Sequence, residues 1–364
     1  MVLFTHAIPS VEESGALRSV LHYLHYLGPS GVDLFFVLSG FLIGGLLFKE
    51  ISLKSQLDVR RFILRRGFKI WPAYFAFLAF VLIRLLLLDN ESVYAAFKSL
   101  LPNVLHVQNY FGSPRGHTWS LAVEEHFYLL LPFLLAFLAR PGRNSRLGLT
   151  WLPAIVLCVC IFCAALRYQA YSSPSFFNPH FATHLRLDSL FFGVLIAYLH
   201  EHAPQILSTT TRRPMALLIF AVSMLMAYPA LVQYDQGNLV VGTIGFVMLY
   251  TAYGSLLLLM IYTPSNSGRF GSWLRGSAAR SLAFIGFYSY SIYLWHIDAQ
   301  FFIAKLTAHG VFNFLMPEVR WLVYFTIYVA SAVACGYVLA RLIEMPALAI
   351  RDRLIPARGA RHDA

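Results

Sequence analysis

Long apolar runs alternate with short polar segments along the whole chain. A helix needs roughly 20 apolar residues to cross about 30 Å of hydrocarbon, and it satisfies its backbone hydrogen bonds internally. The pattern therefore predicts an all-α protein, a polytopic transmembrane bundle of about ten helices. Its first apolar stretch is too short to cross alone, so we expect a truncated first helix. The predicted spans are residues 1–10, 32–48, 71–88, 119–138, 150–168, 185–200, 214–232, 239–262, 282–304 and 319–341.

Composition and charge also indicate a membrane protein. The chain is 58% hydrophobic and only 12% charged, whereas soluble domains carry about 25% charged residues. Because the chain crosses the membrane repeatedly, every second loop lies on the same side, and the loops of one side hold 20 of the 28 Lys and Arg residues. The positive-inside rule assigns that side to the cytoplasm. These loops are residues 49–69, 140–149, 200–213, 263–281 and 341–364. The net charge of +11 therefore faces anionic membrane lipid, and we expect no nucleic-acid partner.

The remaining chain-wide features suggest one domain. Residues 1–350 read as an integral membrane domain, and residues 351–364 as a short, basic, disordered cytoplasmic tail. Met1 leads into an apolar run without a basic region or cleavage site, so no cleavable signal peptide is expected. All four cysteines fall in predicted spans, where they read as packing residues and not as disulfides or a metal site. They are Cys158, Cys160, Cys163 and Cys335.

The segment TWSLAVEEHFYLLLP, residues 118–132, places Glu124, Glu125 and His126 inside an apolar stretch. Ionisable residues are costly in lipid, so they usually have a functional role. The alternative is that such residues lie at the membrane interface without a functional role. For Glu125 and His126 the sequence favours neither interpretation over the other.

Ser120, Glu124 and Tyr128 recur every four residues, so they share one face of a helix, with Trp119 beside them. A hydroxyl, a carboxylate and a phenol on one stripe could orient a hydroxyl-bearing acceptor. The simpler interpretation is helix capping by Thr118 or Ser120, with Glu124 near the positive helix end.

Two further polar features begin the predicted second span. Ser30 and Asp33 have the spacing of a capping box. Asp33 could also orient a partner base in a buried site, and capping does not exclude that role. Gly40 and Gly44 form a small-xxx-small pattern that lets another helix approach closely.

A basic block, RRFILRRGFKIWP, runs from Arg60 to Pro72. If it is helical, Arg61, Arg65 and Lys69 share a face and Arg66 lies beside them. The simpler interpretation is a topology anchor. The alternative is a phosphate site that runs into a helix start at Trp71 and Pro72, because Arg forks match phosphate oxygens. Such a site would suit a nucleotide-bearing acyl carrier such as coenzyme A.

Three isolated histidines, His6, His184 and His296, occur in apolar surroundings. An isolated histidine of this kind is more often structural or interfacial than functional.

Six segments, taken in order, resemble the landmarks of the acyltransferase-3 membrane family, and the resemblance covers nearly the whole chain. Each fragment alone is weakly specific, but the ordered set is strongly specific. The segments are GVDLFFVLSGFLI, RRGFKIWP, TWSLAVEEHFYLLLP, RLDSLFFGVLIAYL, YSYSIYLWH and the EMP at Glu344 to Pro346.

The resemblance implies a multi-pass enzyme of the cytoplasmic membrane. It would move an acyl group, commonly acetyl, from acyl-coenzyme A to a hydroxyl of a surface carbohydrate or a related extracytoplasmic acceptor. No bound cofactor is implied, because acyl-coenzyme A is a co-substrate.

The resemblance also implies roles for individual residues. His6 aligns with an essential family histidine and would act as a general base or carry the acyl group transiently. Asp33 or Glu124 would orient its ring. The donor would be held by Arg65, Arg66 and Lys69. The acceptor would lie against Trp119, Ser120, Tyr128 and His296.

Three positions depart from the family pattern. The arginine that precedes the family histidine by ten intervening residues would fall before Met1. Lys69 stands where arginine is usual, which keeps the charge but loses the bidentate fork. His126 stands where glutamine is common, which adds a titratable group.

Two rival functions remain open at this stage. Intramembrane carboxylates and histidines also mark transporters or flippases, although no inverted repeat is visible in this sequence. The missing arginine suggests, as a third possibility, a scaffold without acyl-transfer activity.

Overall fold

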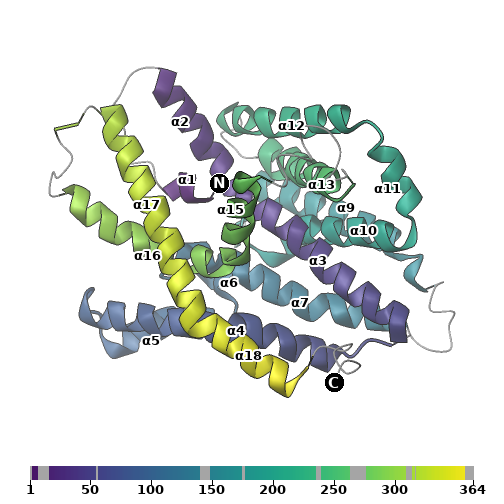
Figure 1. The fold of residues 1–364 in the computed structure, drawn as a ribbon, viewed down its shortest axis with the longest axis horizontal. Helices are drawn as coiled ribbons and strands as arrows, with labels where there is room; N and C mark the ends of the chain where they lie inside the picture. The colour runs from purple at the N-terminus through teal and green to yellow at the C-terminus, as the bar shows by residue number, and fades with distance from the viewer. Residues whose placement is uncertain are drawn as a thin grey trace. The chain divides into compact units, whose positions relative to one another are not determined.

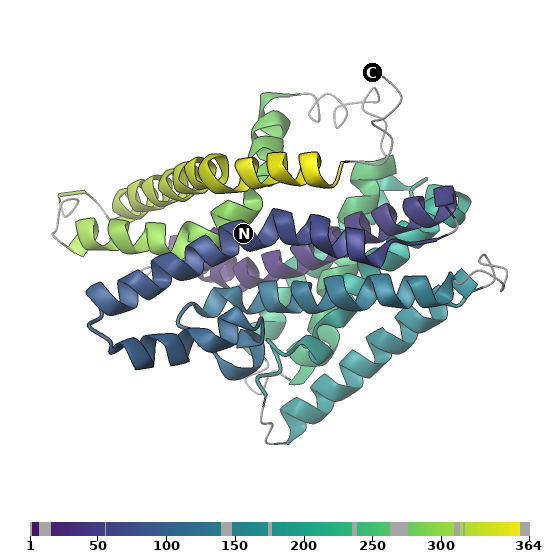
Figure 2. The ribbon, with the colours of Figure 1, turned by 90° about the horizontal axis from the view of Figure 1, so that it is seen from below.

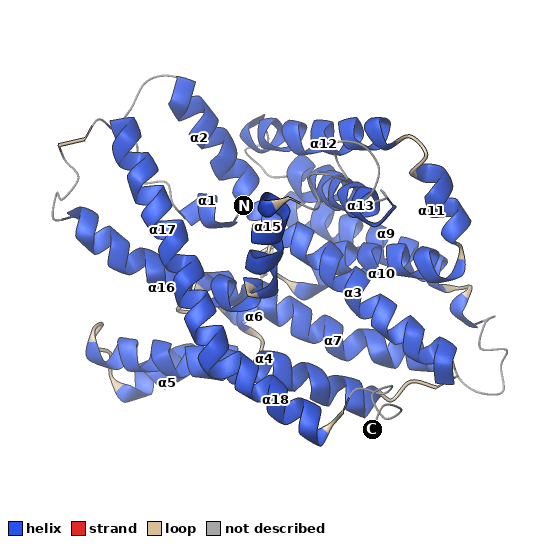
Figure 3. Cartoon of the chain, in the orientation of Figure 1, coloured by secondary structure: helices blue, strands red, loops and turns tan. Residues whose placement is uncertain are grey.

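The computed structural model of the 364-residue chain describes residues 2–6, 16–54, 56–139, 148–173, 177–234, 239–262, 276–308, 314–315 and 317–356. Within these ranges every regular element is a helix, so the predicted all-α class is confirmed (Figure 3). The chain forms two compact units, which are described separately. The first unit comprises residues 1–2, 26–59 and 105–272, and the second comprises residues 3–25, 60–104 and 273–364.

The first unit is built around the packing of two helices, α3 and α10, which lie side by side (Figure 1). Small residues let them approach. A Cβ on Gly40 would lie 1.9 Å from the Leu190 carbonyl oxygen, and a Cβ on Gly193 would lie 2.2 Å from that of Val37. The predicted close approach at Gly40 is therefore confirmed. The helices of this unit are α3 (Gly31–Lys54), α6 (Gln108–Phe111), α7 (Trp119–Leu138), α9 (Leu152–Ser172), α10 (Leu187–His202), α11 (Pro204–Thr210), α12 (Pro214–Tyr234) and α13 (Phe246–Tyr262).

The core of the first unit is apolar and aromatic. Val37 of α3, Ile196 of α10 and Leu249 of α13 are buried in one cluster, together with Tyr253. A short π-helical segment, Val241–Gly245, leads into α13. In Figure 2, α9 is inclined to α7 within this unit. This arrangement places the amino-terminal turns of α3, α7 and α10 near buried polar groups, which are described below.

The second unit packs α16 along α17. The short α1 contacts both helices, because Leu3 packs on a cluster of Ala299, Tyr328 and Ala332. A second π-helical segment, Ala340–Glu344, joins α17 to α18. The helices of this unit are α1 (Val2–His6), α2 (Ala16–Leu27), α4 (Val59–Leu87), α5 (Val93–Val104), α15 (Ser277–Phe287), α16 (Ser289–Ala308), α17 (Pro317–Leu339) and α18 (Met345–Leu354).

Seven helical segments within the described ranges are long and apolar enough to cross a membrane, so the chain is a multi-pass membrane protein. They overlap seven of the ten predicted spans. The other three predictions, 1–10, 185–200 and 282–304, are not among the seven. Helices α1 and α10 are short, with 5 and 16 residues. Helix α16 has 20 residues, but polar residues such as His296, Asp298 and Lys305 make it less apolar than the seven. The seven segments are Tyr23–Lys54, Val59–Leu87, Gly116–Leu138, Leu152–Ser172, Pro214–Val232, Val241–Tyr262 and Val319–Leu354.

Two predicted boundaries are wrong. The sequence placed a helix start at Trp71 and Pro72, but α4 begins at Val59 and continues through Pro72. Proline removes one backbone donor, and tertiary packing can compensate for that loss inside a membrane bundle. Disorder was predicted from Arg351, but α18 extends to Leu354. Residues 357–364 of the expected tail lie outside the described residues.

Candidate functional site

Asp33 lies in the first turn of α3, and its carboxylate is held by the beginning of α10. Asp33 Oδ1 accepts a hydrogen bond of 2.7 Å from Arg186 Nη2 and one of 3.1 Å from Ser189 Oγ. Both members of the ion pair are buried, with 2% and 3% exposure. Within lipid an isolated charge is costly, so each side chain compensates the other. The ion pair joins the first and fourth of the sequence landmarks.

The stripe predicted on α7 exists and is buried. Tyr128 donates a hydrogen bond to Glu124 Oε2 at 3.1 Å, so these two residues share a face. The Ser39 and Tyr128 hydroxyls are 2.8 Å apart. Because the Tyr128 proton goes to Glu124, Ser39 donates to Tyr128. Ser120 is buried on the same face. A continuous hydrogen-bonded line therefore runs from α3 through Tyr128 to Glu124.

Trp119 connects the stripe with the buried ion pair. Its ring packs edge-on against Phe36, with centroids 6.0 Å apart. The Arg186 guanidinium lies 5.5 Å from the Trp119 ring. Three predicted site residues, Asp33, Trp119 and Glu124, are thus placed by helices of the same unit.

Two capping interpretations are not what the structure shows. The Thr118 side chain makes no cap hydrogen bond to α7, and its hydroxyl donates to the Arg115 carbonyl oxygen at 2.8 Å. The Ser30 hydroxyl donates to the Leu27 carbonyl oxygen at 2.6 Å and also contacts the Tyr253 hydroxyl. The side chain of Asp33, the other half of the proposed capping box, is committed to α10. At the start of α3 a tertiary partner on α10 has therefore taken the Asp33 side chain, whereas at the start of α7 the Thr118 hydroxyl turns back to a carbonyl three residues earlier.

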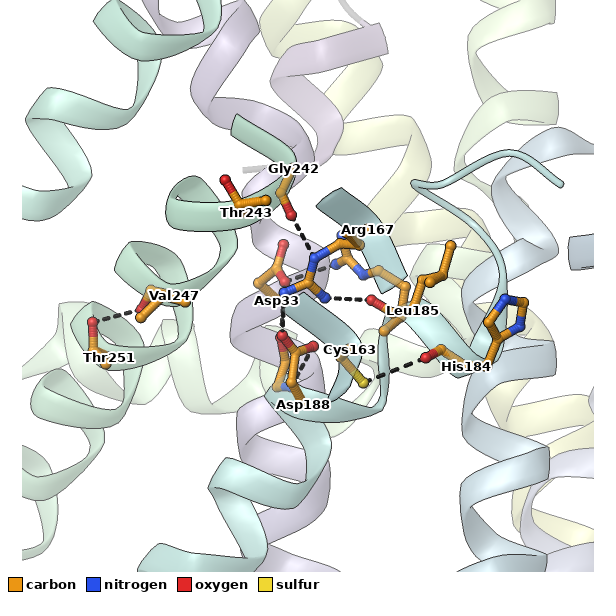
Figure 4. A network of polar contacts seen from close by, with 12 residues as sticks. Asp33, Cys163, Arg167, His184, Leu185, Asp188, Gly242, Thr243, Val247 and Thr251 are labelled. Atoms are coloured by element: carbon orange, nitrogen blue, oxygen red, sulfur yellow. Dashed lines mark hydrogen bonds and ion pairs between the residues drawn. The ribbon is translucent and has the colours of Figure 1, made fainter. Parts of the chain in front are cut away.

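A second buried ion pair was not predicted from the sequence. Arg167 of α9 is fully buried and donates to Asp188 Oδ2 at 2.6 Å. Figure 4 shows its guanidinium directed at Asp188 and at the carbonyl oxygens of Leu185 and Gly242. Arg167 and Asp188 are ionisable residues inside predicted spans. The argument that ionisable residues are costly in lipid, which drew attention to Glu124, applies equally to Arg167 and Asp188.

An aromatic ring links the two ion pairs. Phe246 lies under both guanidinium groups, with its centroid 3.9 Å from Arg186 and 4.9 Å from Arg167. His180, in the segment before α10, packs against the same ring. Burial and the positive charges of Arg186 and Arg167 lower the pKa of His180 to about 4, so its imidazole is neutral at pH 7.

His184 is a structural histidine of the first unit. Its Nδ1 lies 3.0 Å from the Tyr110 hydroxyl, and the two rings stack with centroids 5.8 Å apart. Burial lowers the pKa of His184 below its ordinary value. These contacts are those expected from the simpler interpretation, a hydrogen-bonded structural histidine.

His6 and His296 come together in the second unit. Their ring centroids are 5.1 Å apart and the rings are tilted by 53°. His296 is fully buried, and its Nδ1 lies 2.6 Å from the Tyr293 carbonyl oxygen. A carbonyl oxygen only accepts, so Nδ1 carries a proton and donates it to Tyr293. The structure thus places a hydrogen-bonded histidine beside His6.

The basic face of α4 is helical, as the spacing required. Arg61 donates to the Pro356 carbonyl oxygen, and Arg65 donates to that of Ile355. Arg65 also pairs with Asp352, with Nη2 and Oδ1 3.3 Å apart. These groups lie at the carboxyl end of α18, where unpaired carbonyls attract cations. The guanidinium of Arg66 lies over the Phe62 ring at 5.8 Å.

Two further contacts join sequence landmarks within the second unit. The Tyr290 hydroxyl donates to the Ile70 carbonyl oxygen at 3.1 Å, and Ser291 donates to Glu344 Oε2 at 2.9 Å. The segments RRGFKIWP, YSYSIYLWH and EMP are therefore neighbours in space.

The predicted site residues thus divide between the two units. Asp33, Trp119, Ser120, Glu124 and Tyr128 belong to the first, whereas the second holds His6, Arg65, Arg66, Lys69 and His296. Within the described ranges, no group of three or more His, Cys, Asp or Glu residues could hold a metal ion.

Comparison with known proteins gives a match over most of the chain. A family model described as an acyltransferase domain matches residues 1–341. The protein SACOL0978 of Staphylococcus aureus (strain COL), named as a candidate O-acetyltransferase, is 27% identical over 301 residues. O-acetyltransferase OatA of Staphylococcus aureus (strain NCTC 8325 / PS 47) is 26% identical over 300 residues.

In both cases the alignment covers 77% of this chain and 47% of the relative. The chain therefore spans about half the length of the curated relatives it matches. No solved structure matches the chain.

Proposed function

The chain belongs to the acyltransferase-3 family, and we propose that it is a membrane-embedded enzyme that transfers an acetyl group from acetyl-coenzyme A to a hydroxyl of a surface carbohydrate. The observation that carries this proposal is the family match across residues 1–341. The two relatives named above, whose names specify O-acetyl transfer, support acetyl as the group and oxygen as the acceptor atom. The excess of cationic loops on one side supports the cytoplasmic membrane as the location and the cytoplasm as the donor side.

In the proposed mechanism, His6 provides the acid–base chemistry. A neutral imidazole removes the proton from the acceptor hydroxyl while that oxygen attacks the thioester carbonyl carbon. The tetrahedral intermediate then collapses: the carbon–sulfur bond breaks, and the leaving thiolate takes the proton from the imidazolium. In the alternative route the imidazole nitrogen attacks first, releases the thiol, and passes the acyl group to the acceptor oxygen. Both routes use the same residue and the same substrates.

The donor phosphates would bind the cationic face of α4. Arg65 already holds one oxyanion, the Asp352 carboxylate, and that carboxylate is half exposed. A phosphate of acyl-coenzyme A offers Arg65 a similar set of oxygens with greater charge. Arg66 and Lys69 would supply the additional positive charge.

The acceptor would lie along the α7 stripe. A sugar packs its apolar face on an aromatic ring such as Trp119 and exchanges hydrogen bonds with hydroxyls such as those of Ser120 and Tyr128. Glu124, which accepts a hydrogen bond from Tyr128, would orient the acceptor hydroxyl. Asp33 has a different immediate task, because it neutralises Arg186.

The test is acyl transfer in isolated membranes. Membranes that contain the parental chain, His6→Ala or His202→Ala are incubated with radiolabelled acetyl-coenzyme A, and label in the glycan fraction is counted. We expect the His6→Ala variant to lose at least about 100-fold in rate, the usual effect of removing a general base. His202→Ala, which removes an exposed imidazole of α10, is the matched control and should retain parental activity.

Three outcomes would contradict parts of the proposal. Parental transfer by His6→Ala would remove His6 from the chemistry. Movement of a glycan across the membrane without label would support a transporter. No label in any sample, with all chains present in the membrane, would support a scaffold.

A further inference from the structure

The carbonyl group of His6 needs a hydrogen-bond partner, because His6 is the last residue of α1. The last four carbonyls of any helix have no intrahelical donor. In this chain the side-chain amide of Gln300, on α16, donates to the His6 carbonyl oxygen. Gln300 therefore caps the helix that carries the proposed catalytic imidazole.

The position of Gln300 on α16 makes this contact more than a local cap. Gln300 follows His296 by four residues, so both side chains lie on the same face of α16. His296 meets the ring of His6, and Gln300 meets its backbone. On the same turn, Ala299 packs in the cluster that receives Leu3. One face of α16 thus contacts α1 at three points.

We propose that Gln300 is a positioning residue for acyl transfer, which holds the His6 imidazole in register with its neighbour His296. This inference rests on the proposed role of His6. Apolar contact through Leu3 fixes the distance of α1 from α16 but permits rotation and sliding, whereas a directed hydrogen bond to the His6 backbone restricts both. The sequence gives no signal for Gln300, because a single glutamine in an apolar helix fits no catalytic pattern.

The first experiment separates kcat from KM. The variant Gln300→Leu has a similar volume and cannot donate a hydrogen bond. We expect its kcat to fall about 10- to 100-fold, since a misplacement near 1 Å can cost about 100-fold. Its KM for acetyl-coenzyme A should stay within about twofold, because no donor contact is removed. Tyr290→Phe is the matched control: it also removes a hydrogen bond from α16 to a backbone carbonyl, at Ile70, and should leave kcat unchanged.

The second experiment uses Gln300→Glu, which keeps the shape of the side chain. An ionised carboxylate repels the His6 carbonyl oxygen, but a protonated one can donate to it. A glutamate has an ordinary pKa of about 4.3, and burial raises the pKa of such a group. We therefore expect the ratio of variant to parental kcat to rise at least about threefold as the pH falls from about 8 to about 5.5, following the protonated fraction of the carboxyl. A purely structural defect would leave this ratio flat.

The results discriminate this inference from the proposed function. Loss of activity in His6→Ala together with parental kcat in Gln300→Leu overturns the positioning role alone. A fall in kcat that comes with a flat pH ratio in Gln300→Glu also overturns it. Parental activity in His6→Ala overturns both.

Discussion

Two buried carboxylates of the first unit are each paired with a buried arginine. Asp33 pairs with Arg186, and Asp188 pairs with Arg167. In soluble proteins, removing one partner of a buried pair costs about 3–5 kcal/mol, whereas replacing both by apolar groups is often neutral. The difference arises because a single substitution leaves an uncompensated charge. This asymmetry separates a structural from a catalytic role for Asp33.

We predict a strong interaction between Asp33→Leu and Arg186→Leu. Each single variant should lower the free energy of unfolding by about 3–5 kcal/mol, and the double variant should recover most of that loss. The measurement is the temperature at which half of the protein remains soluble in detergent, for all three variants. Glu201→Leu, at an exposed carboxylate of α10, is the control and should change stability by no more than about 0.5 kcal/mol.

Acetyl transfer by the same three variants provides a second measurement. If Asp33 acts only through Arg186, the stable double variant should transfer acetyl groups. A double variant that is as stable as the parent but inactive would contradict this structural role and return Asp33 to the chemistry.

At the scale of helices, contact between α3 and α10 depends on backbone meeting backbone. Gly40 faces the Leu190 carbonyl, and Gly44 faces Val194 and Ala197 of the next turn. In lipid, helices associate through such close packing, because burial of apolar surface gives little driving force between them. The same contact aligns Asp33 with Arg186, so packing and ion pairing support each other.

Gly40→Ala is predicted to separate these helices. Its Cβ would lie 1.9 Å from a backbone oxygen, which cannot move aside cheaply. We expect a loss of at least about 1–3 kcal/mol, measured by the same thermal assay. Gly45→Ala is a matched control on α3, because nothing lies within 4 Å of its added Cβ. Equal thermal stability of Gly40→Ala and Gly45→Ala would contradict the close packing of α3 on α10 at Gly40.

The two π-helical segments also serve the polar contacts. Gly242, whose carbonyl accepts from Arg167, lies in Val241–Gly245. Glu344, which accepts from Ser291, ends Ala340–Glu344. A π turn shifts the regular ladder of backbone hydrogen bonds, and such turns are frequent at functional sites. Hydropathy patterns contain no trace of these local changes.

At the scale of the whole molecule, the orientation in the membrane follows from charge. The residues before α4 belong to the most cationic predicted loop, so the amino end of α4 is expected in the cytoplasm and its carboxyl end outside. Single cysteines on either side of α4 can test this. Gln56 and Ser92 are both exposed.

We predict opposite labelling of Gln56→Cys and Ser92→Cys by a membrane-impermeant maleimide. In a background in which the exposed Cys158 is replaced by serine, Ser92→Cys should react in intact cells. Gln56→Cys should react only after permeabilisation. The reverse order would place the proposed donor face outside the cell and remove the basis for an acyl-coenzyme A donor.

Much of this architecture was predictable because it depends on composition. Residues that cross lipid must be apolar and helical, so seven spans can be located from hydropathy alone. The four-residue spacings were equally predictable: they placed Glu124 with Tyr128 on one face of α7, and Arg61 with Arg65 on one face of α4. The start of α4 was not predictable from the sequence, because proline usually marks the beginning of a helix. Only tertiary packing lets α4 continue through Pro72.

The sequence by itself determined that this protein is a helical membrane protein that resembles the acyltransferase-3 family, because hydropathy and ordered family motifs are local properties of the chain. Only the tertiary structure decided which polar groups meet. Asp33 turned from its expected cap to Arg186, Arg65 reached the end of α18, and Gln300 reached the carbonyl of His6. These partners lie 153, 290 and 294 residues apart. Pairing over such separations depends on how helices pack, and helix packing depends on surface shape and not on spacing along the chain.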